Sequence, residues 1–315
     1  MGIIKPERLK TGDVIGIISP ASSPDDLSKI NKGITYLESL GYRVEVGKNV
    51  GQQEGYLAGS DTQRLSDLHD MFKNKNVKAI FTLRGGYGST RLLDKIDYKL
   101  IRNNPKIFVG HSDINALQMA FLTKCGLVTF SGPMVAVDFQ DEISPFTEEL
   151  FWRMLTSNKK IGKLQNPRNE KFFVLTKGRA QGKIIGGNLS LFTSLMGTEF
   201  FPQQQIKGAI LLLEDINEAP YRIDRMLNQL RLAKVFNMIN GVILGDFINC
   251  FETNPEKKSF TLNEVIFDYF KKLKVPVIYN VRHGHVKDNI TFPFGIKCVI
   301  NSGNSSIEIP ESAVK

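Results

Sequence analysis

Residues 106–117, KIFVGHSDINAL, place Ser112 between a histidine and an aspartate, where an apolar run gives way to helix-forming residues. A serine at such a strand-to-helix turn is exposed for nucleophilic attack, and the amide of the next residue, Asp113, can point at a developing oxyanion. Gly110 gives the room that this turn needs, although Ile114 stands where the G-x-S-x-G motif has its second glycine. Alternatively, Ser112 or Asp113 caps the following helix, which needs no catalysis. On this segment alone, helix capping is the favoured interpretation.

A nucleophilic serine needs a base, and the chain has four histidines. His111 adjoins Ser112, but consecutive residues at the end of a strand point to opposite faces, so His111 is poorly placed to accept the proton. The segment RHGHVKDNITFPFG holds His283 and His285, and its glycine-bracketed loop favours a functional imidazole at His285. A lone histidine in a loop more often has no such role, so the alternative of an unused side chain stays open.

A carboxylate that orients the imidazole would complete a catalytic triad. The apolar run AILLL ends with Glu214 and Asp215, which places an acid at the end of a buried strand. Two structural alternatives exist: Glu214 caps or pairs with the arginines of PYRIDRML, or the strand resembles the magnesium-binding strand of nucleotide hydrolases. The second alternative lacks its partner, because the chain has no G-x-x-x-x-G-K-[ST] motif and GRAQGKI has the wrong spacing.

The segment TLRGGYGSTRLL indicates a glycine-rich turn after the strand VKAIF. As a dinucleotide-binding fingerprint it is weak, because Arg91 stands where the third glycine belongs. Gly86 is better suited to bring a backbone N–H to a reacting carbonyl oxygen. Arg84 beside it either grips a substrate carboxylate with two hydrogen bonds or forms a structural salt bridge. Arg222 is a second candidate for the same carboxylate.

These residues need elements that bring them together, and the first half of the chain alternates short β-rich runs with amphipathic helical segments. The order begins with DVIGIISP, DLSKINKGITYLESLG and YRVEVG and continues to LVTFSGPM. It predicts an α/β fold with a parallel sheet and helices on both faces, because parallel neighbours need crossover connections. Ligands gather at the carboxyl ends of such strands. Residues 19–23, 84–88 and 110–113 are expected there.

After a helix over TEELFWRMLTSN, the polar segment KKIGKLQNPRNEKFFVLTKGRAQG lacks periodicity and is expected to be a linker. Beyond it, strands, one or two helices and a β-rich tail indicate a second, smaller α/β domain packed on the first. The expected organisation is a parallel-sheet domain over residues 1–155, a linker over residues 156–177 and a C-terminal domain over residues 178–315.

At 315 residues with 42% hydrophobic content, the chain can build one large domain or two of ordinary size. No long apolar segment or cleavage signature opens it, so neither a signal peptide nor a membrane span is supported, and we expect a soluble, cytoplasmic protein. Its three cysteines lack the spacing of a disulfide framework or a zinc site. The net charge of +9 comes from scattered basic residues without interleaved aromatics, so no nucleic-acid groove is expected.

In combination, these segments resemble the serine LD-carboxypeptidases, also called murein tetrapeptide carboxypeptidases, a family that includes the microcin C immunity peptidases. The similarity runs nearly end to end, through LKTGDVIGIISPAS, GYLAGSDTQRLSDL, LRGGYGSTRLL, VGHSDINAL, FSGPM, GGNLSLFTSLMGT, LLLEDINEAPYRIDRML and GHVKDNITFPFG. Chance is a poor explanation for so many matched segments in one order. The resemblance therefore changes the interpretation of Ser112 from a helix cap to a nucleophile.

The resemblance implies a Rossmann-like N-terminal domain, a C-terminal domain that is partly a β-barrel, and a site between the two. It also implies a homodimer and no need of a metal or cofactor. The site residues that it implies are a catalytic triad and two backbone amides for the oxyanion: Ser112, Glu214 and His285, with the amides of Asp113 and Gly86.

The implied activity is removal of the terminal D-alanine from murein tetrapeptides in cell-wall recycling, through an acyl-enzyme. Its partner would be a small muropeptide, with no role for nucleic acid or a membrane. The alternative enzyme is an immunity-type peptidase that cleaves aminoacyl-nucleotide conjugates, which an aromatic side chain stacked on the base would favour. The one tryptophan, Trp152, is instead expected in the core or on a helix surface. A binding protein that holds muropeptides without cleaving them is a further alternative, against which the complete triad argues.

Overall fold

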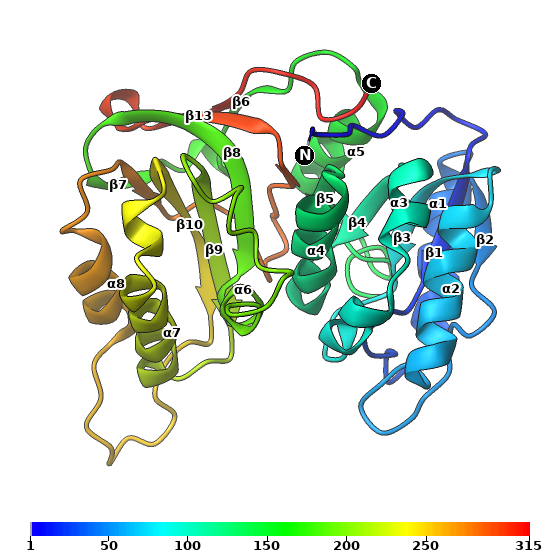
Figure 1. Cartoon of the computed structure of the whole chain (residues 1–315), viewed down its shortest axis with the longest axis horizontal. Helices are drawn as coiled ribbons and strands as arrows, with labels where there is room; N and C mark the ends of the chain where they lie inside the picture. The colour runs from blue at the N-terminus through cyan, green and yellow to red at the C-terminus, as the bar shows by residue number, and fades with distance from the viewer. Residues whose placement is uncertain (1) are drawn as a thin grey trace.

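The computed structural model describes residues 2–315, which form two α/β domains side by side (Figure 1). The first sheet has six strands in the order β12-β5-β4-β3-β1-β2. Neighbours among β1 to β5 pair in parallel, which confirms the predicted parallel sheet, while β12 pairs antiparallel to β5. The strand bounds are β1 Val14–Ile18, β2 Arg43–Val46, β3 Val77–Thr82, β4 Ile107–Gly110, β5 Thr129–Ser131 and β12 Phe292–Phe294.

Helices cover this sheet, and one of them lies between the two domains. The helix that follows Ser112, α4, has nine of its eleven residues buried. It is buried so completely because it packs on β5 of its own domain and on β8 and α6 of the second domain. The helical bounds are α1 Ser28–Ser39, α2 Asp61–Lys73, η1 Ser89–Lys95, α3 Tyr98–Asn103, η2 Ser112–Ile114, α4 Asn115–Cys125 and α5 Pro145–Thr156.

The second sheet has eight strands in the order β6-β14-β13-β8-β9-β10-β11-β7. Its centre, β8 to β11, is parallel, and the outer strands pair antiparallel. The strands are β6 Gly162–Leu164, β7 Phe173–Thr176, β8 Arg179–Asn188, β9 Ile210–Ile216, β10 Gly241–Ile248, β11 Val277–Tyr279, β13 Lys297–Asn301 and β14 Ser306–Ile309. The helices are η3 Pro167–Asn169, α6 Leu189–Ser194, α7 Pro220–Leu232, η4 Val235–Asn237, α8 Leu262–Phe270 and η5 Ser302–Asn304.

The second sheet is open. Barrel closure requires the first and last strands of a sheet to pair, and no pairing joins β6 to β7 within residues 2–315. The mixed α/β class and the two-domain arrangement are confirmed, but the part of the C-terminal domain expected as a barrel is an open sheet. Its two edge strands come from the segment 156–177, which the sequence pattern predicts as a linker.

The two ends of the chain and one distant strand tie the domains together. β12 comes from the C-terminal part of the sequence but completes an edge of the first sheet. The last residue also returns to the start of the chain, because Lys315 N donates to Pro6 O at 3.0 Å and Arg8 N donates to Lys315 O at 3.0 Å. The two termini therefore lie at the same end of the molecule (Figure 1).

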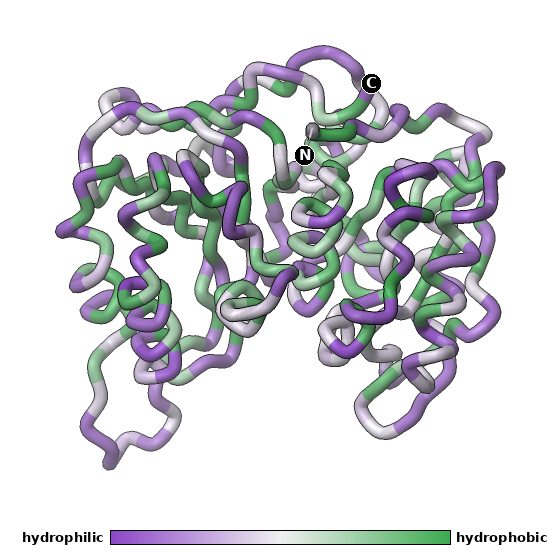
Figure 2. Tube along the Cα trace, viewed as in Figure 1, coloured by the Kyte–Doolittle hydropathy of each residue, from purple (hydrophilic) through white to green (hydrophobic). Residues whose placement is uncertain are grey.

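The cores of both domains follow the strands. Figure 2 shows hydrophobic residues concentrated along the two sheets and hydrophilic residues along the outer helices and loops. In β9, the run Ile210–Leu213 is fully buried, as expected for a parallel strand covered on both faces. Within the described chain, every helix falls short of the length and apolar character that a bilayer crossing requires.

Candidate active site

Ser112 sits in a strained turn between β4 and α4. Its φ of 63° lies in the left-handed region, which a non-glycine residue adopts at a cost of about 1–3 kcal/mol. The N-cap of α4 is Ile114, and no side chain makes a capping hydrogen bond to this helix. The alternative prediction from the sequence, that Ser112 or Asp113 caps this helix, is therefore wrong. Strain of this kind is concentrated at functional sites, so the turn supports a chemical role for the serine.

The turn depends on a glycine in the neighbouring loop. A Cβ placed on Gly85 would lie 2.9 Å from Ser112 Cβ and 3.1 Å from Ser112 Oγ, closer than side chains pack. The loop that carries Gly86 therefore lies directly against the serine. The sequence pattern predicted both segments at the same edge of the sheet, and the family resemblance implied that they share one site.

His285 and Glu214 are joined by a direct hydrogen bond. His285 Nδ1 donates to Glu214 Oε2 at 2.8 Å, although the two residues are 71 positions apart. Glu214 comes from the end of β9 and only 1% of its side chain is exposed, whereas 17% of the His285 side chain is exposed. Between the two elements, Gly284 lies so close that a Cβ there would be 2.6 Å from Glu214 Oε2. With Nδ1 engaged, Nε2 is the ring nitrogen left to exchange a proton.

The contact sets the charge of both groups. Burial alone would raise the pKa of Glu214, but the hydrogen bond and the positive charge of His285 outweigh it and hold this pKa below its ordinary value. Burial likewise opposes the charged imidazole, yet the hydrogen bond and charge of Glu214 raise the pKa of His285 above its ordinary value. The pair thus favours a carboxylate that stabilises an imidazolium.

His111, the residue before Ser112, contacts this pair. The ring of His111, which directly precedes Ser112, packs edge-on against the ring of His285, with centroids 4.9 Å apart. In the described part of the chain, Ser112 Oγ makes no hydrogen bond to His285. The structure therefore forms the hydrogen bond between the histidine and the glutamate of the predicted triad, and the residue before Ser112 contacts that histidine. Such hydrogen bonds to a nucleophile are often long in unliganded enzymes and shorten with substrate.

Gly86 and Asp113, the two predicted oxyanion donors, line one hollow of about 490 Å³, together with Tyr87, Ser190 and Leu191. The Asp113 backbone is held in place because its carbonyl accepts from Ser89 Oγ at 2.6 Å and its carboxylate accepts from Ser89 N at 2.8 Å. Burial raises the pKa of the Asp113 carboxyl. The N–H of Gly86 makes no backbone hydrogen bond within residues 2–315.

The two predicted substrate-binding arginines lie in different settings. Arg84 donates to Ser23 O at 3.3 Å, and no carboxylate of the described residues pairs with it. Arg222 lies on α7, more than half exposed, and pairs with Glu218 at 3.3 Å. The structure therefore leaves Arg84 beside the Gly86 loop, whereas it places Arg222 at the surface, paired with a residue just before its own helix.

A buried polar network that the sequence analysis missed joins the two domains behind the site. Asn115 Oδ1, at the start of α4, accepts from Asn188 N at 2.8 Å. Asn188 Nδ2 donates to Asp215 Oδ1 at 3.0 Å, and Ser190 Oγ donates to Asp215 Oδ2 at 2.7 Å. Burial raises the pKa of Asp215 to about 6. The polar residues after the double glycine in GGNLS are the one sequence signal that could have indicated this network.

His283, the other histidine of the predicted loop, is structural. It is fully buried, with Nδ1 2.7 Å from Ile290 O and Nε2 3.3 Å from Ser131 Oγ. Burial lowers its pKa to about 4, so this imidazole is neutral at pH 7. Among the residues that the structure describes, no group of three or more histidine, cysteine, aspartate or glutamate side chains is arranged to hold a metal ion.

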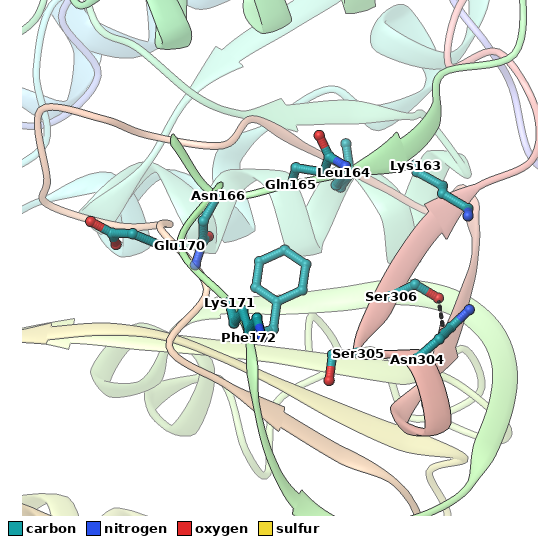
Figure 3. A pocket seen from close by; sticks show the side chains of 10 residues that line it. All are labelled: Lys163, Leu164, Gln165, Asn166, Glu170, Lys171, Phe172, Asn304, Ser305 and Ser306. Atoms are coloured by element: carbon teal, nitrogen blue, oxygen red, sulfur yellow. Dashed lines mark hydrogen bonds between the residues drawn. The ribbon is translucent and has the colours of Figure 1, made fainter. Parts of the chain in front are cut away.

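A separate hollow of about 470 Å³ lies at the outer edge of the second sheet (Figure 3). It opens between residues 163–172 and the turn between β13 and β14. None of the predicted site residues lines it, so this hollow is distinct from the candidate active site.

Comparisons with known proteins identify the family of this chain. Residues 15–132 match the LD-carboxypeptidase N-terminal domain, and residues 181–300 match the LD-carboxypeptidase C-terminal domain. The chain is 40% identical to the probable murein peptide carboxypeptidase of Bacillus subtilis, over 97% of this chain and 94% of that protein.

Solved structures are also similar. The muramoyltetrapeptide carboxypeptidase from Oxalobacter formigenes aligns with a TM-score of 0.82 and 32% identity, over 93% of this chain and 97% of that one. MccF in complex with glutamyl sulfamoyl guanosine aligns with a TM-score of 0.87 and 27% identity, over 99% of each chain.

Proposed function

Because this chain belongs to the LD-carboxypeptidase family of peptidases, we propose that it is a serine-type LD-carboxypeptidase that removes the terminal D-alanine from murein tetrapeptides. The observation that carries the proposal is the 2.8 Å hydrogen bond between His285 and Glu214, together with a serine in left-handed backbone that directly follows a histidine in contact with His285. A strained serine, an imidazole and a buried carboxylate are the parts that acyl transfer through a covalent intermediate requires.

In the first half of the proposed reaction, Ser112 Oγ attacks the carbonyl carbon of the bond to D-alanine, and its proton passes to His285 Nε2. Glu214 stabilises the imidazolium that forms. The N–H groups of Gly86 and Asp113 stabilise the negative charge on the former carbonyl oxygen. The C–N bond then breaks, the imidazolium gives its proton to the departing amine, and D-alanine leaves while the tripeptide stays as an ester on Ser112.

In the second half, a water molecule attacks the ester carbonyl and gives a proton to His285 Nε2. The C–O bond to Ser112 breaks, the serine oxygen recovers the proton from the imidazolium, and the tripeptide leaves with a new carboxylate. The same donors serve both halves, because both pass through an oxyanion at one position.

Cleavage of aminoacyl-nucleotide conjugates is the second candidate. Trp152 does not support it, because this side chain lies in the aromatic cluster of the first domain, stacks on Tyr42 and donates to Tyr36 Oη at 2.9 Å. Tyr56 and Tyr87 form an exposed pair, with ring centroids 5.3 Å apart, in the loops beside Gly86. They are the exposed aromatic side chains beside Gly86 on which a nucleobase could stack.

The test is a mass-spectrometric assay of the purified protein on a murein tetrapeptide ending in D-alanine, run in parallel with glutamyl sulfamoyl guanosine. We expect loss of one alanine by the parent protein and a fall of at least about 10³-fold in Ser112→Ala. Ser39→Ala, a serine exposed on α1, is the matched control and should keep full activity. Undiminished cleavage by Ser112→Ala would refute the serine mechanism, and cleavage of the conjugate alone would favour the second candidate.

We also propose that the enzyme acts in the cytoplasm as a homodimer. The homodimer rests on the resemblance to the family, and the cytoplasmic location rests on the expectation from the sequence. Light scattering during size-exclusion chromatography measures the assembly directly, and a monomeric mass at the concentration used in the assay would refute the dimer.

A further inference from the structure

Ser22, a residue of the loop that follows β1, holds the backbone on both sides of Gly86. Ser22 is buried, with 9% of its surface exposed. Its N–H donates to Gly85 O at 3.2 Å, and its Oγ accepts from Tyr87 N at 3.1 Å. The same hydroxyl donates to Tyr56 O at 2.6 Å. The two peptide groups that flank Gly86 are therefore both bound to one serine.

These contacts set the direction of the Gly86 N–H. Every peptide bond within residues 2–315 is trans, and in a trans peptide the C=O and the N–H point in opposite directions. Because Gly85 O points toward Ser22 N, the N–H of Gly86 points away from Ser22. This N–H makes no hydrogen bond within the described chain. It is therefore available to a reacting oxygen.

The two glycines of this loop allow it to contact both Ser22 and the serine turn. A Cβ on Gly86, whose φ is 104°, would lie 2.7 Å from Ser22 Cβ. A Cβ on Gly85 would lie 2.9 Å from Ser112 Cβ and 3.3 Å from Asp113 N, the other proposed oxyanion donor. Neither approach leaves room for a side chain. The position of Ser22 therefore determines where the peptide between the two glycines lies relative to Ser112.

We propose that Ser22 is a positioning residue of the peptidase reaction, which holds the Gly86 N–H in the orientation that an oxyanion beside Ser112 requires. This inference rests on the proposed function, since it takes Ser112 as the nucleophile and Gly86 as a donor. Ser22 acts through Gly86 and not on the substrate. Donors stabilise an oxyanion best when they are oriented before the reaction, because no reorganisation is then needed. Loss of the Ser22 hydroxyl releases Tyr87 N, so the backbone at Gly86 can turn and its N–H can leave that orientation.

The experiment compares Ser22→Ala with Ser302→Ala, a matched control in η5 of the second domain. Ser302 is 6% exposed, and its Oγ likewise accepts from one backbone N–H, Gly178 N at 2.6 Å, and donates to one carbonyl, Gly178 O at 2.9 Å. Because both variants lose bonds of the same kind, their urea midpoints should fall by similar amounts. On the D-alanine tetrapeptide, kcat of Ser22→Ala should fall by about 10–100-fold while KM stays within about twofold, since an oxyanion donor acts in the transition state. Ser302→Ala should keep the kcat and KM of the parent.

A second measurement separates this inference from the proposed substrate. A fluorophosphonate modifies a nucleophilic serine: the serine oxygen bonds to phosphorus, fluoride leaves, and the P=O oxygen gains negative charge on the way, so the reaction needs the oxyanion donors but no murein peptide. Mass spectrometry of the intact protein should show modification of Ser112 at least about tenfold slower in Ser22→Ala than in the parent.

Equal rates of modification in Ser22→Ala and the parent, an unchanged kcat in Ser22→Ala, or an equal loss of kcat in Ser302→Ala would overturn the positioning role. Slower modification of Ser22→Ala without any cleavage of the tetrapeptide would uphold that role and refute the murein substrate instead. A parent protein that is neither modified nor active on the tetrapeptide would overturn the inference together with the proposed function.

Discussion

Gly284→Ala should separate Glu214 from His285 although neither of these two residues is substituted. A Cβ at this position would lie 2.6 Å from Glu214 Oε2, against about 3.4 Å for an ordinary contact, so the carboxylate must move by about 0.8 Å. A shift of that size away from His285 would stretch their 2.8 Å hydrogen bond to about 3.6 Å, which is no longer a hydrogen bond. We expect kcat to fall by about 10²-fold, or about 2.7 kcal/mol in activation free energy, while KM changes little.

The control for this variant is Gly197→Ala. Gly197 also has a positive φ, of 84°, but a Cβ there would meet nothing within 4 Å. It therefore carries the backbone strain of the substitution without the clash. Steady-state kinetics on the D-alanine tetrapeptide, with thermal unfolding of each variant, give the comparison. A folded Gly284→Ala with the kcat of the parent, or an equal loss of kcat in Gly197→Ala, would refute the reasoning.

Three further predictions follow from the site. Because the reaction needs a neutral His285 and Glu214 raises the pKa of this imidazole, kcat/KM should fall on the acid side with a midpoint above that of an ordinary histidine. Glu214→Gln should move this midpoint to lower pH, and a midpoint that stays in place would contradict the assignment. Asn115→Ala leaves the buried Asn188 N–H unpaired, so urea unfolding should show a loss of about 1–3 kcal/mol in stability, whereas an unchanged midpoint would show that the bond is not needed. Arg84→Ala should raise KM more than it lowers kcat, and an unchanged KM would end its role as the carboxylate ligand.

The parallel sheet of the first domain could be predicted from the sequence, because alternation of strand and helix patterns is local. The proposed role of Ser112 could not, since the local pattern favoured a helix cap and only the family resemblance indicated a nucleophile. The run AILLL marks β9 as a buried strand, and the acid that ends it is therefore held rigidly. The partnership of Glu214 with His285 could not be derived from spacing, since it depends on how two separate elements pack. It came instead from resemblance to a family.

The contacts of His111 could not be predicted from the local sequence pattern. Alternation at the end of a strand argued against a role as the base for Ser112, and the structure shows no bond between these two side chains. The same argument could not show that the His111 ring would contact His285 from another domain, or that both its nitrogens would lack partners within residues 2–315. The edge strands β6 and β7 were missed for a related reason, because three or four residues are too few to display a period.

The placement of β12 has a consequence for synthesis of the protein on the ribosome. β5 is complete at Ser131, but the strand that covers its free edge emerges about 160 residues later. At about 5–20 residues per second, the first sheet therefore waits roughly ten seconds or more with an open edge. An open edge of this kind can pair with a neighbouring nascent chain. Slower codons, or fewer available chaperones, while residues 132–291 are being translated should thus lower the yield of folded protein. The same change made during translation of the residues before 131 should lower it less.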